Sequence, residues 1–283
     1  MSTERTEHAE HTEPAWQIPG QATRTPAYVS PIPIRQAHLG HALASEWTKI
    51  RSVRSTMWTL GVFLALVIVL GCLMAGLIDG DSYLNTPYTM PAFFGLLLGQ
   101  MCLVSLGVLV VSSEYGTGMI RTTFTASPQR HRVLAAKIIV FFLVAFVTAA
   151  VAIAVVGLYT QLTVDARSNP AWAPTVFMGA LYVSLMGVLA LAMGSMMRHS
   201  AGAITTMLGV VLLPAIMPAF LLFNESLADV AQFMSDYNAI SALSLIFEGD
   251  ASTGHGGAQT ALLAGLTAVA CVGAFAVQTN RDV

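Results

Sequence analysis

Residues 133–159 read VLAAKIIVFFLVAFVTAAVAIAVVGLY, and this stretch decides the fold. It holds one charged side chain, Lys137, near its beginning, and is otherwise almost entirely apolar. A helix of about 20 apolar residues is long enough to cross the hydrocarbon core of a bilayer. A helix also satisfies its own backbone hydrogen bonds where no water is present. We therefore expect residues 133–159 to form a transmembrane helix.

Five further apolar blocks of about this length occur in the sequence, two before it and three after it. Of the 283 residues, 55% are hydrophobic and only 10% are charged, whereas soluble domains carry roughly 25% charged residues. Six such blocks in series disfavour the buried helices of a soluble protein. The sequence predicts an all-α integral membrane protein whose six-helix transmembrane domain covers residues 58–283. The predicted spans are 58–78, 90–111, 133–159, 174–197, 201–223 and 258–277.

The distribution of charge predicts the orientation of these spans. If the N-terminus is cytoplasmic, every Lys and Arg except Arg167 falls on the cytoplasmic side or at its interface. The predicted outer loops instead hold Asp79, Asp81, Asp165, Glu225, Asp229, Asp236, Glu248 and Asp250. The positive-inside rule describes this pattern. We expect a multi-pass protein of the plasma (inner) membrane with both termini in the cytoplasm.

Two segments precede the first span. Residues 1–35 are polar, rich in Glu, Thr, His and Pro, and we expect them to be a disordered cytoplasmic tail. In residues 36–57 apolar side chains recur every three or four positions, which predicts an amphipathic helix lying on the inner leaflet of the membrane, with Trp47 and Lys49 at headgroup level. Glu46 falls inside the apolar stripe, where a bare carboxylate is costly. Its partner could be Lys49 or a basic group from another element; the alternative is an unpaired side chain that reaches water.

The sequence lacks the motifs of several catalytic classes. The dipeptide Gly-Lys does not occur, which excludes a Walker A phosphate loop, and neither HExxH nor GxSxG is present. We expect no catalytic residue, no metal site and no cofactor on this chain. A net charge of −2 gives no indication of a nucleic-acid partner. The middle of each predicted span is free of acids and bases, although ion-coupled carriers usually keep such groups at membrane depth.

One cytoplasmic loop of some size interrupts the spans, within residues 112–137. Glu114 closes the second span, Gly116 permits a tight turn, and Ser127-Pro128 is typical of the N-cap and first residue of the next helix. Arg130 would anchor that helix at the lipid phosphates. A short helix between these points would offer apolar side chains to the cytoplasm, which an ordinary positively charged loop does not explain. These side chains are Tyr115, Met119, Ile120 and Phe124.

The loop also carries a recognisable motif. It contains E-Y-x-x-G-x-I-x-x-T at 114–123, A-S-P-x-R at 126–130 and A-A-K at 135–137. With these motifs the sequence resembles the membrane-spanning permease subunits of type-2 ABC transporters. SEWTKIRSVRSTMWTL at 45–60 is similar to the leading helix of the bacterial members. As topology, the resemblance covers nearly the whole chain.

The resemblance implies a function and partners. This chain would be the permease subunit of an ATP-driven ABC exporter, paired as a homodimer or heterodimer with a similar permease and surrounded by membrane lipids. Separate ABC ATPase subunits would bind ATP and Mg. The loop would receive their motion, through Glu114, Gly116, Thr117, Met119, Phe124, Ser127, Pro128 and Arg130. The family pattern also includes Lys137, and its arginine corresponds to Arg130 or Arg132.

The resemblance further implies a re-entrant helical segment before the last span. Residues 224–257 contain two apolar stretches that are each too short to cross the membrane. It also implies a substrate pathway between the second and fifth spans of two subunits. The second span offers a Gly95-x-x-x-Gly99 step that permits close helix approach. The candidate pathway residues are Phe94, Gln100, Met207, Met217 and Phe220, and they suggest a hydrophobic or amphipathic substrate.

Two functions from other classes remain as alternatives. An ion-coupled secondary carrier is disfavoured by the absence of charges in the middle of the spans. A non-transporting membrane anchor or signalling subunit would leave the outer re-entrant segment without a role. An adjacent reading frame with Walker A and ABC signature motifs would discriminate between these alternatives and the permease.

Overall fold

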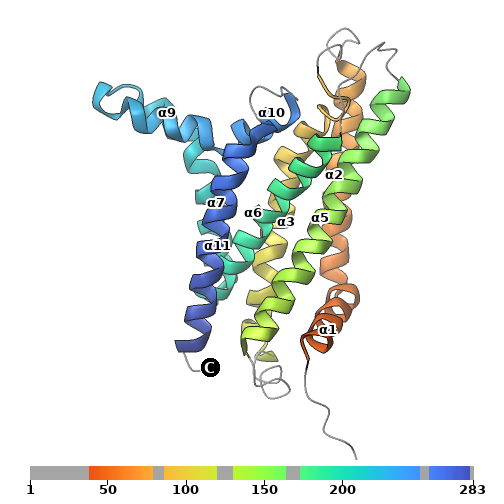
Figure 1. The fold of residues 1–283 in the computed structure, drawn as a ribbon, viewed down its shortest axis with the longest axis vertical. Coiled ribbons are helices and arrows are strands. Elements are labelled where there is room, and N and C mark those ends of the chain that lie inside the picture. Colours follow the sequence, from red (N-terminus) through yellow and green to blue (C-terminus); the bar gives the residue numbers. More distant parts are fainter. Residues whose placement is uncertain (1–37, 79–85, 120–129, 164–172, 249–254, 281–283) are drawn as a thin grey trace, which may run out of the picture. The chain divides into compact units, whose positions relative to one another are not determined.

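The computed structural model describes residues 38–78, 86–119, 130–163, 173–248 and 255–280, and every regular element in these ranges is a helix. Five of the helices are long and apolar enough to cross a membrane. They run between the same two ends of a bundle (Figure 1). These five are α2 (Arg54–Leu77), α3 (Ala92–Gly116), α5 (Arg130–Thr163), α6 (Ala173–Met197) and α11 (Gly257–Asn280).

Helix α6 forms the centre of the bundle. It contacts α3, α5, α7, α10 and α11, and 67% of its most apolar window is buried, compared with 22% for α11. The outer helices expose large apolar side chains such as Val69 on α2 and Val269 on α11. A broad exposed apolar surface marks contact with another apolar phase, and lipid provides one. The described residues therefore fit an all-helical, multi-pass membrane protein.

Glycines bring the central helices close together. A Cβ atom on Gly107 of α3 would collide with the backbone carbonyl oxygen of Gly187 on α6. A Cβ atom on Gly95 would lie 2.5 Å from the Cα atom of Val67 on α2. Small residues at such crossings replace the hydrophobic driving force that lipid removes. The Gly95-x-x-x-Gly99 step therefore packs against α2 of the same chain.

The predicted span 201–223 consists of two helices, α7 (Ser200–Ile216) and α8 (Pro218–Leu221). Pro214 is accommodated inside α7, but Pro218 has no N–H group to continue the ladder of hydrogen bonds, and the helix is interrupted before it. With 17 residues, α7 is about 25 Å long at 1.5 Å per residue, which is less than the ~30 Å of a bilayer core. The described residues thus give five candidate spans where the sequence predicts six.

The two apolar stretches before α11 form the short helices α9 (Ala228–Tyr237) and α10 (Ala239–Glu248), which follow the 3-10 turn η2 (Glu225–Leu227). Helix α10 packs into the bundle with Leu243 and Phe247 fully buried. Helix α9 buries only Ala231 and leaves Phe233 exposed. The side chain of Asn238 joins the two helices, because it accepts hydrogen bonds from the first free N–H groups of α10.

The predicted interfacial helix is shorter than residues 36–57. Helix α1 covers Leu39–Ser52, and α2 begins at Arg54, four residues before the predicted start of the first span. Between them Val53 is extended, with φ −82° and ψ 111°. This break ends the run of helical hydrogen bonds and lets α1 lie against α5 at one end of the bundle (Figure 1).

Candidate functional site

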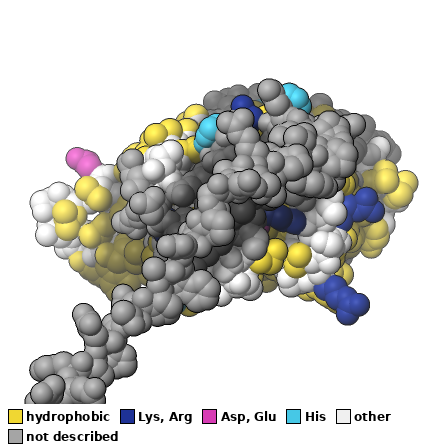
Figure 2. All heavy atoms as spheres, turned by 90° about the horizontal axis from the view of Figure 1, so that it is seen from below, with side chains coloured by type: hydrophobic (Ala, Val, Ile, Leu, Met, Phe, Trp, Pro, Cys, Tyr) yellow, Lys and Arg dark blue, Asp and Glu magenta, His cyan; other side chains and the backbone are white. Residues whose placement is uncertain are grey.

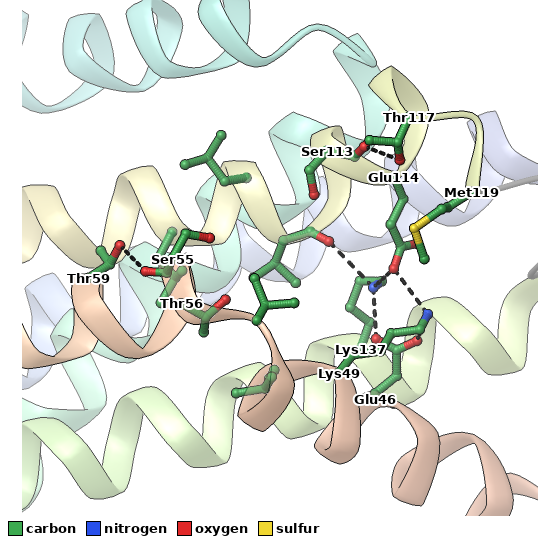
Figure 3. Close-up of a pocket in the computed structure, with 15 residues that line it drawn as sticks. Glu46, Lys49, Ser55, Thr56, Thr59, Ser113, Glu114, Thr117, Met119 and Lys137 are labelled. Carbon is green, nitrogen blue, oxygen red and sulfur yellow. Dashed lines mark hydrogen bonds and ion pairs between the residues drawn. The ribbon is translucent and has the colours of Figure 1, made fainter.

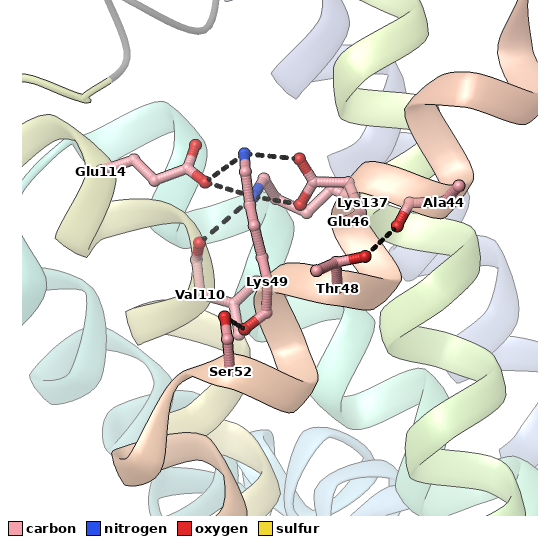
Figure 4. A network of polar contacts seen from close by, with 8 residues as sticks. All are labelled: Ala44, Glu46, Thr48, Lys49, Ser52, Val110, Glu114 and Lys137. Atoms are coloured by element: carbon pink, nitrogen blue, oxygen red, sulfur yellow. Dashed lines mark hydrogen bonds and ion pairs between the residues drawn. The ribbon is translucent and has the colours of Figure 1, made fainter.

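Four charged side chains form a closed ring where α1, α3 and α5 meet, which we call the ion cluster: Glu46, Lys49, Glu114 and Lys137 (Figure 4). The Nζ atom of Lys49 lies 2.7 Å from Glu46 Oε1 and 3.0 Å from Glu114 Oε1. The Nζ atom of Lys137 lies 2.8 Å from Glu46 Oε2 and 2.8 Å from Glu114 Oε1. Each base bridges both acids, so three helices are joined by one network.

Local structure explains why these four groups meet. Glu46 and Lys49 are three residues apart and share one face of α1 with the buried Ile50. Glu114 lies in the last turn of α3, and Lys137 lies about two turns inside α5. The chain reverses direction between these two helices, so the end of one meets the beginning of the other. The break at Val53 then brings α1 alongside.

The ion cluster is buried and electrically balanced. Glu46, Glu114 and Lys137 are each at most 6% exposed, while the side chain of Lys49 is 28% exposed. Two acids face two bases, so the net charge is zero. In this setting, removing one member leaves an uncompensated buried charge, which typically costs about 3–5 kcal/mol. The ring therefore holds α1, α3 and α5 in one arrangement.

Electrostatics act most clearly on Lys49, which lies outside the candidate spans. Burial lowers the pKa of Lys49, but Glu46 and Glu114 together raise it by more, so the pKa lies above the ordinary value of 10.5. Lys49 is therefore charged throughout the physiological range.

The hydrogen bonds of the cluster are incomplete at one atom. Oε1 of Glu114 accepts from both lysines, whereas Oε2 is buried and has no hydrogen-bond partner among the described residues. In Figure 4 the second oxygen of Glu114 carries no dashed line. A buried acceptor without a donor is costly, so this atom marks a place where a further donor would be favourable.

The structure shows which groups pair with the carboxylate of Glu46. Both predicted partners are present, Lys49 from the same helix and Lys137 from α5, and the unpaired alternative is wrong. Trp47 is exposed, and the guanidinium of Arg51 lies 5.9 Å from its ring centre. Part of the apolar stripe on α1 thus packs on protein, while another part remains exposed, as an interfacial helix requires.

The predicted coupling residues are only partly described. Glu114 belongs to the ion cluster, Gly116 ends α3, and the hydroxyl of Thr117 donates to the carbonyl of Ser113 at 2.8 Å. Met119 is exposed. Three others, Phe124, Ser127 and Pro128, lie outside the described residues, and Arg130 is described only as the first residue of α5.

The candidate pathway residues differ in exposure. Gln100 and Met207 are buried in the core, Phe94 and Met217 are half-buried, and Phe220 is exposed. The amide nitrogen of Gln100 donates to the carbonyl of Leu97 at 3.3 Å, and its buried oxygen has no partner among the described residues.

Without the family resemblance, sequence reasoning does not identify Lys137 as a member of the ion cluster or Arg198 as a neighbouring contact. Lys137 could have been noticed, because it is a charge inside an otherwise apolar block, where charges are costly. Nothing in the sequence around Arg198 indicates its role. Arg198 adopts a left-handed backbone with φ 54° between α6 and α7, and its guanidinium stacks 5.2 Å from the ring centre of Tyr115 on α3.

The described residues contain no group of three or more His, Cys, Asp or Glu side chains that could hold a metal ion. No protein-family model matches this sequence, and no curated protein matches it either. The geometry of the ion cluster and the sequence motifs therefore carry the functional interpretation.

Proposed function

We propose that this chain is the membrane-spanning permease subunit of an ATP-driven ABC exporter, acting with separate ATPase subunits that bind ATP and Mg. It would work as a homodimer or heterodimer with a similar permease and move a hydrophobic or amphipathic substrate across the plasma membrane. The chain itself would perform no catalysis. Its part would be mechanical, as the receiver of motion from the ATPases.

The observation that carries this proposal is the position of the ion cluster. Glu114 and Lys137 lie toward the two ends of the loop within residues 112–137, which the family resemblance assigns to ATPase contact, and both bind to α1 through Glu46 and Lys49. A force on the loop would reach α1, α3 and α5 together, because separating these buried charges is costly. A loop without such an anchor would bend without moving the spans.

We propose six spans, with α7 and α8 together forming the fifth, and a re-entrant segment made of α9 and α10. Helix α7 runs between the same two ends as the longer helices, and the C-terminal end of α11 lies at the end that holds α1 (Figure 1). Viewed from that end, Lys and Arg side chains are prominent on the described surface (Figure 2). This end would be cytoplasmic under the positive-inside rule.

The substrate pathway would lie between two copies of the chain. Phe220 is exposed and could face a second copy, whereas Gln100 and Met207 would reach the pathway only after helix movement. A Gln100→Leu variant should keep its ATPase partner and show altered substrate-stimulated ATP hydrolysis. Normal transport by Gln100→Leu, Met217→Ala and Phe220→Ala would place the pathway elsewhere.

An ion-coupled carrier is the second candidate, because the ion cluster provides buried acids and bases. Its position argues against that role: Glu114 lies in the last turn of α3, far from the middle of the span. Each carboxylate is also bound to two ammonium groups, so both acids are already engaged in structural ion pairs. Transport that persists in vesicles without ATP or an ATPase would favour the carrier.

The test of the proposed function is association with an ATPase. The tagged chain, purified from its own membrane, should retain a soluble subunit that hydrolyses ATP and carries Walker A and ABC signature motifs. Met119→Asp, at the exposed end of the loop, should weaken that association while membrane insertion is unchanged. Leu227→Asp, an exposed apolar residue at the opposite end, is the matched control and should have no effect. Retention of no ATPase, or equal retention by both variants, would refute the coupling assignment.

A further inference from the structure

A cavity of about 250 Å³ adjoins the ion cluster (Figure 3). Its floor is formed by buried residues of the cluster together with Thr56 and Leu106. Its rim is exposed and lies where α1 passes into α2, opposite the last two turns of α3. The volume is smaller than the roughly 300–1,000 Å³ of sites that enclose a whole small molecule. The cavity therefore suits one part of a molecule whose remainder lies outside.

The lining of the cavity is amphipathic. One part is aliphatic, with Ile50, Val53, Leu106, Leu109 and Val110. Hydroxyl groups of Ser55, Thr56, Thr59, Ser113 and Thr117 line another part, and the charged groups of the ion cluster line a third. Leu109 and Val53 are exposed on the outer surface of the helices. Such a surface fits a ligand that has a polar head and an apolar chain.

Beside this cavity the cluster has one acceptor and one donor position without a partner among the described residues. The acceptor is Oε2 of Glu114, which is buried and has no hydrogen-bond partner in the described part of the chain. The donor is Lys49, whose ammonium has three N–H groups and makes two hydrogen bonds, to Glu46 and Glu114, within the described part of the chain. Lys137, by contrast, has three acceptors, the third being the carbonyl oxygen of Val110 at 3.5 Å. A ligand that carries both a cationic donor, for Oε2 of Glu114, and an anionic acceptor, for Lys49, would therefore satisfy both groups.

We propose that the cavity binds a zwitterionic phospholipid whose headgroup carries a primary amine. Its ammonium donates to Oε2 of Glu114, and its phosphate accepts from Lys49 and from the hydroxyls of Ser55 and Ser113, because those of Thr59 and Thr117 already donate to backbone carbonyls. An acyl chain lies along Leu109 and Val53 and continues into the bilayer. Because the headgroup is neutral overall, it leaves the charge balance of the ion cluster unchanged, whereas an anionic lipid without an amine would leave Oε2 of Glu114 without a donor.

For the lipid ammonium to reach the buried carboxylate of Glu114, the side chain of Met119 must move. Met119 lines the same cavity and is exposed on its outer side, and an unbranched thioether side chain adopts new rotamers easily. A trimethylated ammonium has no N–H group to donate, so it cannot satisfy the carboxylate oxygen. Selectivity for the primary amine over the quaternary amine of a choline headgroup follows from this difference.

The experiment uses the full chain with any subunits that remain bound, reconstituted in vesicles that contain equal amounts of phosphatidylethanolamine and phosphatidylcholine with matched chains. Native mass spectrometry then measures the lipid retained on each chain. We expect one retained phosphatidylethanolamine and a preference of about tenfold over phosphatidylcholine, since a hydrogen bond to a charged group is among the stronger ones. Equal retention of the two lipids would overturn the proposal, because it would indicate an unselective lipid shell.

A matched pair of variants locates the site. Leu109→Trp places a bulky ring at the rim without touching the ion cluster, and we expect the retained phosphatidylethanolamine to be lost. Leu98→Trp, also exposed on α3 but outside the cavity, should retain it. Equal retention by both variants would show that the lipid binds elsewhere. Displacement of the lipid by soluble phosphoethanolamine at comparable concentration would also refute the proposal, because the apolar wall would then contribute nothing.

Discussion

The ion cluster predicts an unusual order of stabilities for substitutions at its four positions. Replacing Lys137 by Met keeps the length of the side chain but leaves Lys49 as the one base that pairs with Glu46 and Glu114 among the described residues. The site is buried, so the variant should lose about 3–5 kcal/mol of unfolding free energy. Lys49→Met should lose less, roughly 1–2 kcal/mol, because water reaches part of that side chain and screens the charge left behind.

The double variant Glu114→Gln/Lys137→Met separates charge balance from simple loss of contacts. It removes one acid and one base and leaves the Glu46–Lys49 pair, at 2.7 Å, intact and neutral. The double variant should therefore be more stable than Lys137→Met alone, and the two substitutions should be coupled by at least about 1 kcal/mol.

The assay is unfolding in mixed micelles by increasing denaturing detergent, followed by tryptophan fluorescence. Trp47 and Trp58 lie on α1 and α2, on either side of the break at Val53, and far-UV circular dichroism verifies that each variant begins from the same helical content. The reasoning is refuted if Lys137→Met costs no more than Lys49→Met, or if the two substitutions in the double variant are simply additive.

Three further predictions concern other parts of the chain. Gly107→Ala should lose about 1–3 kcal/mol in the same assay, because its Cβ atom would meet a backbone carbonyl of α6; Gly61→Ala, with open space around it, should not, and equal effects would contradict the close packing. Single cysteines at Ser45 and His199, introduced in a cysteine-free background, should react with an impermeant reagent only after permeabilisation, and labelling of intact cells would reverse the proposed orientation. The pKa of Lys49 is raised on folding, so the stabilisation from the Lys49 charge is fully present below pH 10.5 and is lost as the pH rises through the pKa of the folded state. The difference in unfolding free energy between the unchanged chain and Lys49→Met should therefore stay constant from pH 7 to 9. A decline in that range would contradict the assignment.

The long helices could be predicted from sequence because their signal is local. A block such as 133–159 is expected to be helical in lipid, since a helix is the structure in which one segment satisfies its backbone hydrogen bonds by itself. The predicted edges agree with the structure to within about five residues for 90–111, which overlaps α3 (Ala92–Gly116), and for 174–197, which lies in α6 (Ala173–Met197). The absence of the dipeptide Gly-Lys was likewise readable from the sequence alone, and it excludes a Walker A loop.

The point at which the predicted span 201–223 divides into two helices could not be predicted from the sequence. Pro214 and Pro218 both predict a disturbance of that helix, but only the structure shows that α7 continues through Pro214 and ends before Pro218. The loss of a backbone donor can be compensated by neighbouring helices, and that compensation depends on packing. The length of the uninterrupted helix was therefore not determined by local sequence.

The sequence by itself determined that Glu46 lies in an apolar stripe and needs a basic partner. Only the tertiary structure decided which basic side chains pair with it. Lys49 was available from helical spacing, whereas Lys137 lies 91 positions away in sequence. Its approach depends on the break at Val53 and on the antiparallel packing of α3 and α5. Hydropathy fixes each helix separately, because it depends on composition, but a buried ion cluster depends on distances between helices, which are set only when all of them pack.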